Sequence, residues 1–281
     1  MHATPHLPSG ISRRAAVLLL VGLCGSVIDS RAQEGIQPRY IASQLTCSRF
    51  LETAASDIHT ESGGRVRDQT AGRRAVWQFK AYPAVEGLLL EGWLDSLSLW
   101  RKSQETTIRP DTDGLLGGRY RATLSGRGAY VSQARPFVPD EVAEVAGMAS
   151  ALDDFFPPLP PRPLSPGQTW QDSTGIILRR VADSALSGVR LYRFELQIRR
   201  SIGNTAAARD TAPLRLTQVS REHGAFVWHP LLGLIRRDRR IEIDTSVPAG
   251  STIRQPVRSR IEQRITVVRD LSVTPGQNEG C

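Results

Sequence analysis

Regular alternation of apolar and polar residues is the feature of this chain that most constrains its fold. In Val189–Arg199, the apolar residues Phe194, Leu196 and Ile198 alternate with charged and amide side chains. Successive side chains of a β-strand point to opposite faces, so this period of two predicts a strand with one buried face. Val257–Val268 shows the same pattern.

Similar stretches recur along the chain, with turn-forming pairs such as Asp113-Gly114 and Ser187-Gly188 between them. They predict further strands at Leu45–Thr60, Arg74–Tyr82, Leu88–Trp100, Arg119–Leu124, Ala129–Ala134, Ile176–Ala182, Leu214–Arg221 and Leu234–Thr245. Strands joined by short turns pair with antiparallel neighbours. The expected fold is therefore mainly β, an antiparallel meander that forms a curved sheet or half-barrel.

One helix is expected at residues 140–156, where the alternation breaks. Apolar residues recur there at helical spacing after Asp140, and two prolines follow Phe156. Residues 157–166 (PPLPPRPLSP) then hold six prolines and predict a stiff, extended connector between two halves of the fold. Because strands of both halves can complete one sheet, residues 33–281 are expected to form a single β-rich domain.

The first 32 residues have the features of an export signal. Arg13 and Arg14 precede a short apolar stretch, Ala15–Leu23, and small residues stand at positions −3 and −1 before Gln33. The apolar stretch is too short to anchor the protein in a bilayer. We expect cleavage near Ala32 and a periplasmic or extracellular product.

Details of this signal indicate which export route the protein takes and whether a lipid anchors it to the membrane. Arg13 and Arg14 resemble the start of a twin-arginine signal, but Ala16 stands where Phe is usual, which favours an ordinary secretory signal. Leu23 precedes Cys24 where a lipoprotein signal has a small residue, so lipid attachment is not expected. No later stretch is apolar over a membrane-spanning length, so the mature chain is expected to lack a transmembrane segment.

The chain is basic, with a formal net charge of +8, and all of its 36 basic residues except Lys80 and Lys102 are arginine. The arginines are spread along the chain, and exported proteins rarely meet nucleic acid, so no nucleic-acid partner is expected. The arginine bias is typical of a GC-rich genome. Anionic lipid head groups or another envelope component stay open as partners.

Two cysteines, Cys47 and Cys281, remain after removal of the signal. An oxidising compartment favours a disulfide between them. Two free thiols, or a dimer linked through Cys281, are the alternatives.

No arrangement of residues typical of catalysis or metal binding stands out. The mature chain has three histidines, His59, His223 and His229, none at a typical metal-ligand spacing. Residues 111–114 (DTDG) begin like a calcium loop, but Ala122 stands where the bidentate Glu is required. We therefore expect no catalytic residue, metal ligand or cofactor site, and an enzymatic activity stays open only as a hydrolase with an unfamiliar site.

Tryptophans are the residues that best suggest a ligand cavity. Aromatic side chains on a curved sheet can line such a cavity, and they can equally be ordinary core residues. The residues considered for the cavity are Trp77, Trp93, Trp100 and Trp228.

One segment resembles a known family. The residues that carry the resemblance are Leu159-Pro160, then Pro163-Leu164, then Pro166-Gly167-Gln168-Thr169-Trp170. This segment is similar to one of uncharacterised secreted or lipoprotein-like bacterial all-β proteins. The resemblance implies an antiparallel sheet whose second half follows this segment, and an architecture similar to the half-barrels of lipoprotein carriers. It implies no catalytic residues. Within the segment, Gly167 suits a tight turn, and Trp170 is expected to anchor the strand that follows.

Two functions follow from these expectations. The first is an exported envelope protein that binds a lipid or another apolar ligand on a curved sheet, without catalysis. The alternative is a structural or protein-interaction module of the cell envelope with a filled core.

Overall fold

The computed structural model describes residues 37–206, 214–249 and 254–272, which all belong to one compact unit, Gly35–Cys281. The predicted signal lies outside the described residues, so its cleavage near Ala32 stays a prediction. Among the described residues, no helix has the length and apolar character needed to cross a bilayer.

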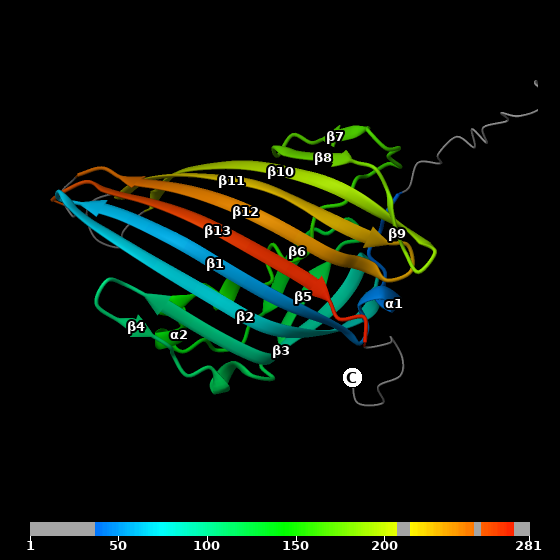
Figure 1. Cartoon of the computed structure of the whole chain (residues 1–281), viewed down its shortest axis with the longest axis horizontal. Coiled ribbons are helices and arrows are strands. Elements are labelled where there is room, and N and C mark those ends of the chain that lie inside the picture. The colour runs from blue at the N-terminus through cyan, green and yellow to red at the C-terminus, as the bar shows by residue number, and fades with distance from the viewer. Residues whose placement is uncertain (1–36, 207–213, 250–253, 273–281) are drawn as a thin grey trace, which may run out of the picture. The chain divides into compact units, whose positions relative to one another are not determined.

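Strands make up most of the described chain (Figure 1). The elements are α1 (Ala42–Leu45), β1 (Ser48–Ser62), β2 (Arg65–Ala84), β3 (Gly87–Lys102), β4 (Thr107–Ile108), β5 (Tyr120–Leu124), β6 (Tyr130–Ala134), α2 (Asp140–Val145), β7 (Thr169–Gln171), β8 (Ile176–Arg180), β9 (Ser184–Leu186), β10 (Val189–Ala206), β11 (Leu214–His229), β12 (Gly233–Val247) and β13 (Val257–Arg269). Two short 3-10 helices, η1 (Asp113–Leu115) and η2 (Met148–Ser150), complete them.

The described strands form one open, curved sheet in which neighbouring strands are antiparallel, which confirms the predicted mainly β fold (Figure 1). The strand order is β6-β5-β3-β2-β1-β13-β12-β11-β10-β8-β7. Each half of the chain is thus a meander, and the first strand of one half pairs with the last strand of the other. Because β1 pairs with β13 along most of its length, both halves complete a single sheet.

Alternation sorts the side chains onto two faces of the sheet. Phe194, Leu196 and Ile198 are buried on the inner face of β10, and Ile265 and Val267 are buried on that of β13. The outer face carries the charged residues between them. The hairpin that joins β1 and β2 turns at Gly63 and Gly64, whose φ angles of 58° and 75° are those that glycine adopts in such tight turns.

The helix predicted over residues 140–156 is shorter in the structure. It covers Asp140–Val145, and Ala146 is already extended, with φ −152°. Residues 147–164, which we name the inner segment, run in turns against the inner face of the sheet. Phe155 and Phe156 are both buried there, and a helix would turn such adjacent side chains about 100° apart. The irregular backbone lets both rings reach the core.

Aromatic rings hold the inner segment against the sheet. Phe155 packs edge-on against Phe50 of β1, with ring centroids 5.6 Å apart, and Phe156 packs in the same way against Tyr40 at 5.5 Å. Tyr40 also meets Trp228 of β11 at 5.0 Å. Each such pair contributes about 0.5–1.5 kcal/mol beyond the area that it buries.

The proline-rich connector packs against the sheet as well. Leu159 and Leu164 are almost fully buried. The guanidinium of Arg180, a residue with no exposed surface, donates to the carbonyl of Leu164 at 2.6 Å and pairs with Asp183 at 2.8 Å. The connector is therefore a structural part of the core rather than a loose link.

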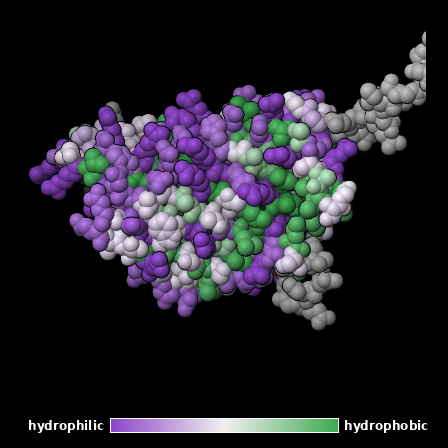
Figure 2. All heavy atoms as spheres, in the orientation of Figure 1, coloured by the Kyte–Doolittle hydropathy of each residue, from purple (hydrophilic) through white to green (hydrophobic). Residues whose placement is uncertain are grey.

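Hydrophilic side chains cover most of the face seen in Figure 2, and hydrophobic ones gather toward the end that carries α1. The exposed large apolar residues at that end include Ile41 just before α1, Leu51 of β1 and Leu231 in the turn between β11 and β12.

Candidate functional site

The inner face of the sheet holds a cavity of about 460 Å³ beside the inner segment, which we name the inner cavity. Four isoleucines form its apolar floor: Ile198 of β10, Ile241 and Ile243 of β12, and Ile265 of β13. Gly147, Ser150 and Ala151 line its side next to the inner segment. This volume lies within the range of about 300–1,000 Å³ that is typical of small-molecule sites.

The apolar surface continues along the sheet beyond the cavity floor. Ile243, Ile261 and Ile58 stand opposite one another on the adjacent strands β12, β13 and β1. Since side chains alternate between faces, all three share the face of Ile241 and Ile265. All three are partly exposed, so the stripe is open to a ligand.

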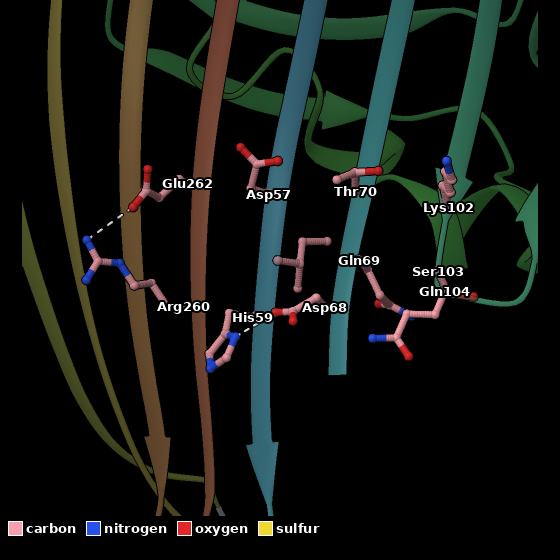
Figure 3. Close-up of a pocket in the computed structure, with 11 residues that line it drawn as sticks. Asp57, His59, Asp68, Gln69, Thr70, Lys102, Ser103, Gln104, Arg260 and Glu262 are labelled. Atoms are coloured by element: carbon pink, nitrogen blue, oxygen red, sulfur yellow. Dashed lines mark hydrogen bonds and ion pairs between the residues drawn. The ribbon is translucent and has the colours of Figure 1, made fainter. Parts of the chain in front are cut away.

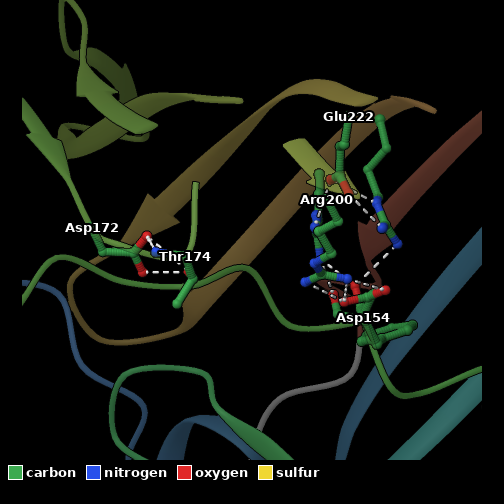
Figure 4. Close-up of polar contacts among 8 residues, drawn as sticks. Asp154, Asp172, Thr174, Arg200 and Glu222 are labelled. Carbon is green, nitrogen blue, oxygen red and sulfur yellow. Dashed lines mark hydrogen bonds and ion pairs between the residues drawn. The ribbon is translucent and has the colours of Figure 1, made fainter. Parts of the chain in front are cut away.

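Charged side chains form the rim of the inner cavity. Arg73, Arg200 and Arg239 line it, together with the carboxylates of Asp154 and Glu222. Figure 4 shows three of these residues, Asp154, Arg200 and Glu222. The combination of an apolar floor and a charged rim suits an amphiphilic ligand.

Glu222 is the centre of a buried ion network. Its carboxylate accepts from Arg237 at 2.8 Å and from both ends of the Arg239 guanidinium at 2.9 and 2.7 Å. Burial by itself would raise the pKa of Glu222, but the two guanidinium groups outweigh it and hold that pKa below its usual range. Burial also lowers the pKa of Arg237 to about 10.

The same two arginines fix the end of the inner segment. Arg237 donates to the backbone carbonyls of Asp154 and Phe155, the latter at 3.0 Å, and Arg239 donates to that of Asp154 at 3.1 Å. Charged donors make strong hydrogen bonds, so this end of the segment is firmly held.

A second buried ion pair lies across the cavity, between β1 and β2. Glu52 accepts from the guanidinium of Arg73 and, at 2.7 Å, from the indole of Trp77. The Arg73 guanidinium also contacts the sulfur of Met148 in the inner segment, at 3.6 Å. Both ion networks thus connect the sheet to the inner segment.

The four tryptophans considered for the cavity lie elsewhere. Trp77 and Trp228 are packed in the core with at most 1% of their surface exposed. Trp93 faces the outer side beneath the guanidinium of Arg119, whose carbon lies 3.7 Å from the ring centre. Trp100 covers Gly72, where an added Cβ would meet its ring at 2.4 Å. Isoleucines, rather than these rings, line the inner cavity.

Gly167 and Trp170 lie in the turn and strand that follow the connector. Gly167 has φ 83°, which glycine adopts readily, and its N–H donates to the carbonyl of Arg180 at 2.8 Å. Trp170 stands opposite Leu178 in the pairing of β7 with β8 and packs against the hydrophobic core.

A second groove, of about 420 Å³, lies on the outer face (Figure 3). In it, the two ring nitrogens of His59 lie 2.6 Å from Asp68 and 3.2 Å from Glu61. Hydrogen bonds to two carboxylates raise the pKa of His59. The bond with Asp68 has the larger effect, and the bond with Glu61 has the smaller one. Ser103 lines the groove too, but its hydroxyl exchanges hydrogen bonds with the backbone of Thr106.

The other histidine with a described role caps a turn. The Nδ1 of His229 accepts from the backbone N–H groups of Leu231 and Leu232, at 3.0 and 3.1 Å. Within the described ranges, no group of three or more His, Cys, Asp or Glu side chains is arranged to hold a metal ion.

The proposed disulfide cannot be followed to its second cysteine, because Cys281 lies outside the described residues. Cys47 stands between α1 and β1 with a φ of 58°, an unusual angle for a residue other than glycine. The pairing of Cys47 with Cys281 stays a prediction.

The sequence predicted the long strands but not the charged rim. The rim could have been found from charged residues at positions that alternation assigns to the inner face. Glu222 lies an even number of residues from Phe226 on β11, so the two side chains share a face. Arg237 and Arg239 share a face with Ile241 and Ile243 of β12 for the same reason. A charge in such a position requires a partner, because burying it alone is costly.

No family model and no curated protein sequence matches the chain. Among solved structures, lipovitellin is similar over 84% of this chain and 27% of its own, with 14% identity and a TM-score of 0.39. A Bacteroides fragilis NCTC 9343 protein, named as exported and as having a YmcC-like fold, is similar over 81% of this chain and 97% of its own, with 11% identity and a TM-score of 0.18. A DUF1329 family protein from Desulfovibrio piger ATCC 29098 is similar over 83% of this chain and 89% of its own, with 9% identity and a TM-score of 0.16.

These similarities are too distant to carry an argument about family or function. The chain spans about a quarter of the lipovitellin chain that it matches, at 27%. The resemblance based on Leu159-Pro160 and Pro166-Gly167-Gln168-Thr169-Trp170 therefore stays a prediction, and the mainly β fold is what the structure itself supports.

Proposed function

We propose that this protein is exported and binds a lipid or another amphiphilic ligand in the inner cavity, without catalysis. The export signal supports the compartment, and the combination of isoleucine floor and charged rim supports the ligand class. An acyl chain would lie on the isoleucines, and its polar end would remain at the rim.

One observation carries this proposal. The inner segment covers one part of the inner face. Next to it, Ile198, Ile241 and Ile265 belong to the hydrophobic core and also border a void of about 460 Å³ that the segment leaves unfilled. Apolar side chains that border a void lose the contacts that neighbouring atoms would make on that side. A bound acyl chain would supply those contacts.

The alternative is a structural or protein-interaction module of the envelope. The inner segment favours it, because Phe155, Phe156 and Leu159 fill a large part of the inner face by themselves. In that case, the inner cavity would hold only water.

Filling the cavity tests the proposal. We expect the mature protein to bind a fluorescent fatty-acid analogue, and Ile243→Trp to abolish binding because the indole occupies the floor. Leu51→Trp adds the same side chain to the outer face, where Leu51 is 48% exposed, and should bind as the wild type does. Organic extraction of protein purified from the periplasm should also release a lipid.

The result that would overturn the proposal is wild-type protein that carries no lipid and binds no analogue. Crosslinking to another envelope protein would then support the structural alternative.

A further inference from the structure

We propose that the ligand of the inner cavity carries an anionic group, a carboxylate or a phosphate, and that Arg200 binds this group by displacing the carboxylate of Asp154. This inference rests on the proposed function, because it assigns the polar end of the same ligand. In the free protein, Asp154 then occupies the place of the ligand's anion.

Two of the three arginines at the rim are already committed to buried carboxylates. Arg239 pairs with both oxygens of Glu222, and the side chains of the two residues are 9% and 7% exposed. Arg73 pairs with Glu52, whose side chain is 2% exposed. A ligand that displaced either carboxylate would take a counter-charge from a buried group: Glu222 would keep Arg237 alone, and Glu52 would keep only the neutral indole of Trp77. Removing one partner of a buried ion pair costs several kcal/mol.

Arg200 differs from both. Its contacts with Asp154 measure 3.3 to 3.4 Å, longer than the 2.7–2.9 Å of strong charge-assisted hydrogen bonds. The two side chains are 51% and 47% exposed. Water therefore solvates either group when the pair opens, and an exposed pair of this kind stabilises a protein by at most about 1 kcal/mol.

Asp154 can release Arg200 without moving the inner segment. Its backbone carbonyl is held by Arg237 and Arg239, whose contacts do not involve the side-chain carboxylate (Figure 4). Rotation of that side chain alone would open the guanidinium to a ligand.

The position of Arg200 also suits a head-group site. It lies on the inner face of β10, two residues after Ile198 of the cavity floor, and stands opposite Ser220 of β11. Ser220 and Gln218 line the cavity beside it and provide polar side chains for a second contact with the anion. An acyl chain attached to an anion bound here can extend over Ile198 and Ile241.

Calorimetric titration with decanoate, decyl phosphate and decanol tests the inference, since the three probes share a chain and differ in the head group. We expect Arg200→Gln to weaken binding of the anionic probes about tenfold, in line with the loss of one charged hydrogen bond, and to leave decanol unchanged. Asp154→Asn should bind the anionic probes more tightly than the wild type, because the competing charge is gone. Comparison of decanoate with decyl phosphate distinguishes a carboxylate from a phosphate ligand.

Arg199→Gln is the matched control. Arg199 is the neighbour of Arg200 on the same strand, is exposed, and faces the outer side, so its replacement removes the same charge at a distance from the cavity. Unchanged binding of anionic probes by Arg200→Gln, with decanol still bound, would overturn the inference and leave the proposed function intact. Failure of the wild type to bind any of the three probes would overturn both.

Discussion

Glu222 illustrates how a single buried carboxylate organises this protein. It lies on β11, faces inward, and bridges the two arginines that hold the inner segment. A buried ion network contributes little net stability compared with an apolar core, but the loss of one member leaves the others buried and unpaired. The network therefore sets the position of the inner segment rather than adding much to stability.

We expect Glu222→Gln to lower the free energy of unfolding by about 3–5 kcal/mol, because Arg237 and Arg239 lose their shared counter-charge. Denaturation in urea at neutral pH measures the change. Asp244→Asn is the control: Asp244 pairs with Arg221 at 2.8 Å, but both are well exposed, and the loss should not exceed about 1 kcal/mol. Equal losses in the two variants would contradict the structural role of the network.

The pH dependence of stability should reveal the titration of the Glu222 carboxylate. Because the folded-state pKa of Glu222 lies below its unfolded value, its contribution is fully present above the unfolded pKa of about 4.5 and is lost as the pH falls through the folded pKa. The difference in unfolding free energy between wild type and Glu222→Gln should therefore shrink as the solution is acidified below that value. A constant difference would contradict the lowered pKa.

Among the elements, the inner segment decides which part of the inner face is core and which part is cavity. Its irregular backbone buries Met148, Leu152, Phe155 and Phe156, and the hydroxyl of Tyr120 donates to the carbonyl of Met148 at 3.0 Å. The short strands β7 and β8 follow the connector and continue the sheet past β10.

Trp170 should be the anchor of these two strands. We expect Trp170→Ala to lower the free energy of unfolding by about 0.5–3 kcal/mol and to speed hydrogen exchange in β7 and β8, since the indole packs against the core. The exposed neighbour Gln171 gives the control, Gln171→Ala, which should have little effect. A thermal midpoint of Trp170→Ala equal to that of the wild type would show that the residue is not structural.

For the molecule as a whole, the pairing of β1 with β13 joins the two halves of the chain. The backbone N–H of Asp270, just after β13, donates to the carbonyl of Arg49 at 2.9 Å. Arg49 is two residues after Cys47 in the sequence, so this contact places the end of β13 near Cys47. Cys281 follows Asp270 by eleven residues. A chain of that length can span roughly 35 Å when extended, so the pairing is within reach.

We expect mass spectrometry of the mature protein under non-reducing conditions to find the peptides of Cys47 and Cys281 joined, in a chain of monomeric mass that starts near Gln33. The disulfide closes a very long loop, and the chain-entropy model gives a stabilisation of roughly 5 kcal/mol. A mass of twice the chain would indicate a dimer linked through cysteine, and separate peptides would indicate free thiols.

Local patterns in the amino-acid sequence were enough to locate the long strands and to assign their faces, but the short strands β4, β7 and β9 were not predicted. Alternation is a property of consecutive residues, so β10 and β13 could be recognised without knowledge of their neighbours. The extent of the helix at α2 could not be recognised in this way, because the chain becomes extended at Ala146 and the residues that follow pack in turns against distant strands.

The inner cavity and its charged rim depend on tertiary structure alone. Asp154 meets Arg200 and Arg239, residues far away in the chain, only because the inner segment folds back across the sheet. Which inward-facing isoleucines border the void likewise depends on where that segment stops. Alternation places Glu222, Arg237 and Arg239 on the inner face, but the groups that they meet there are set by the packing of elements remote in sequence.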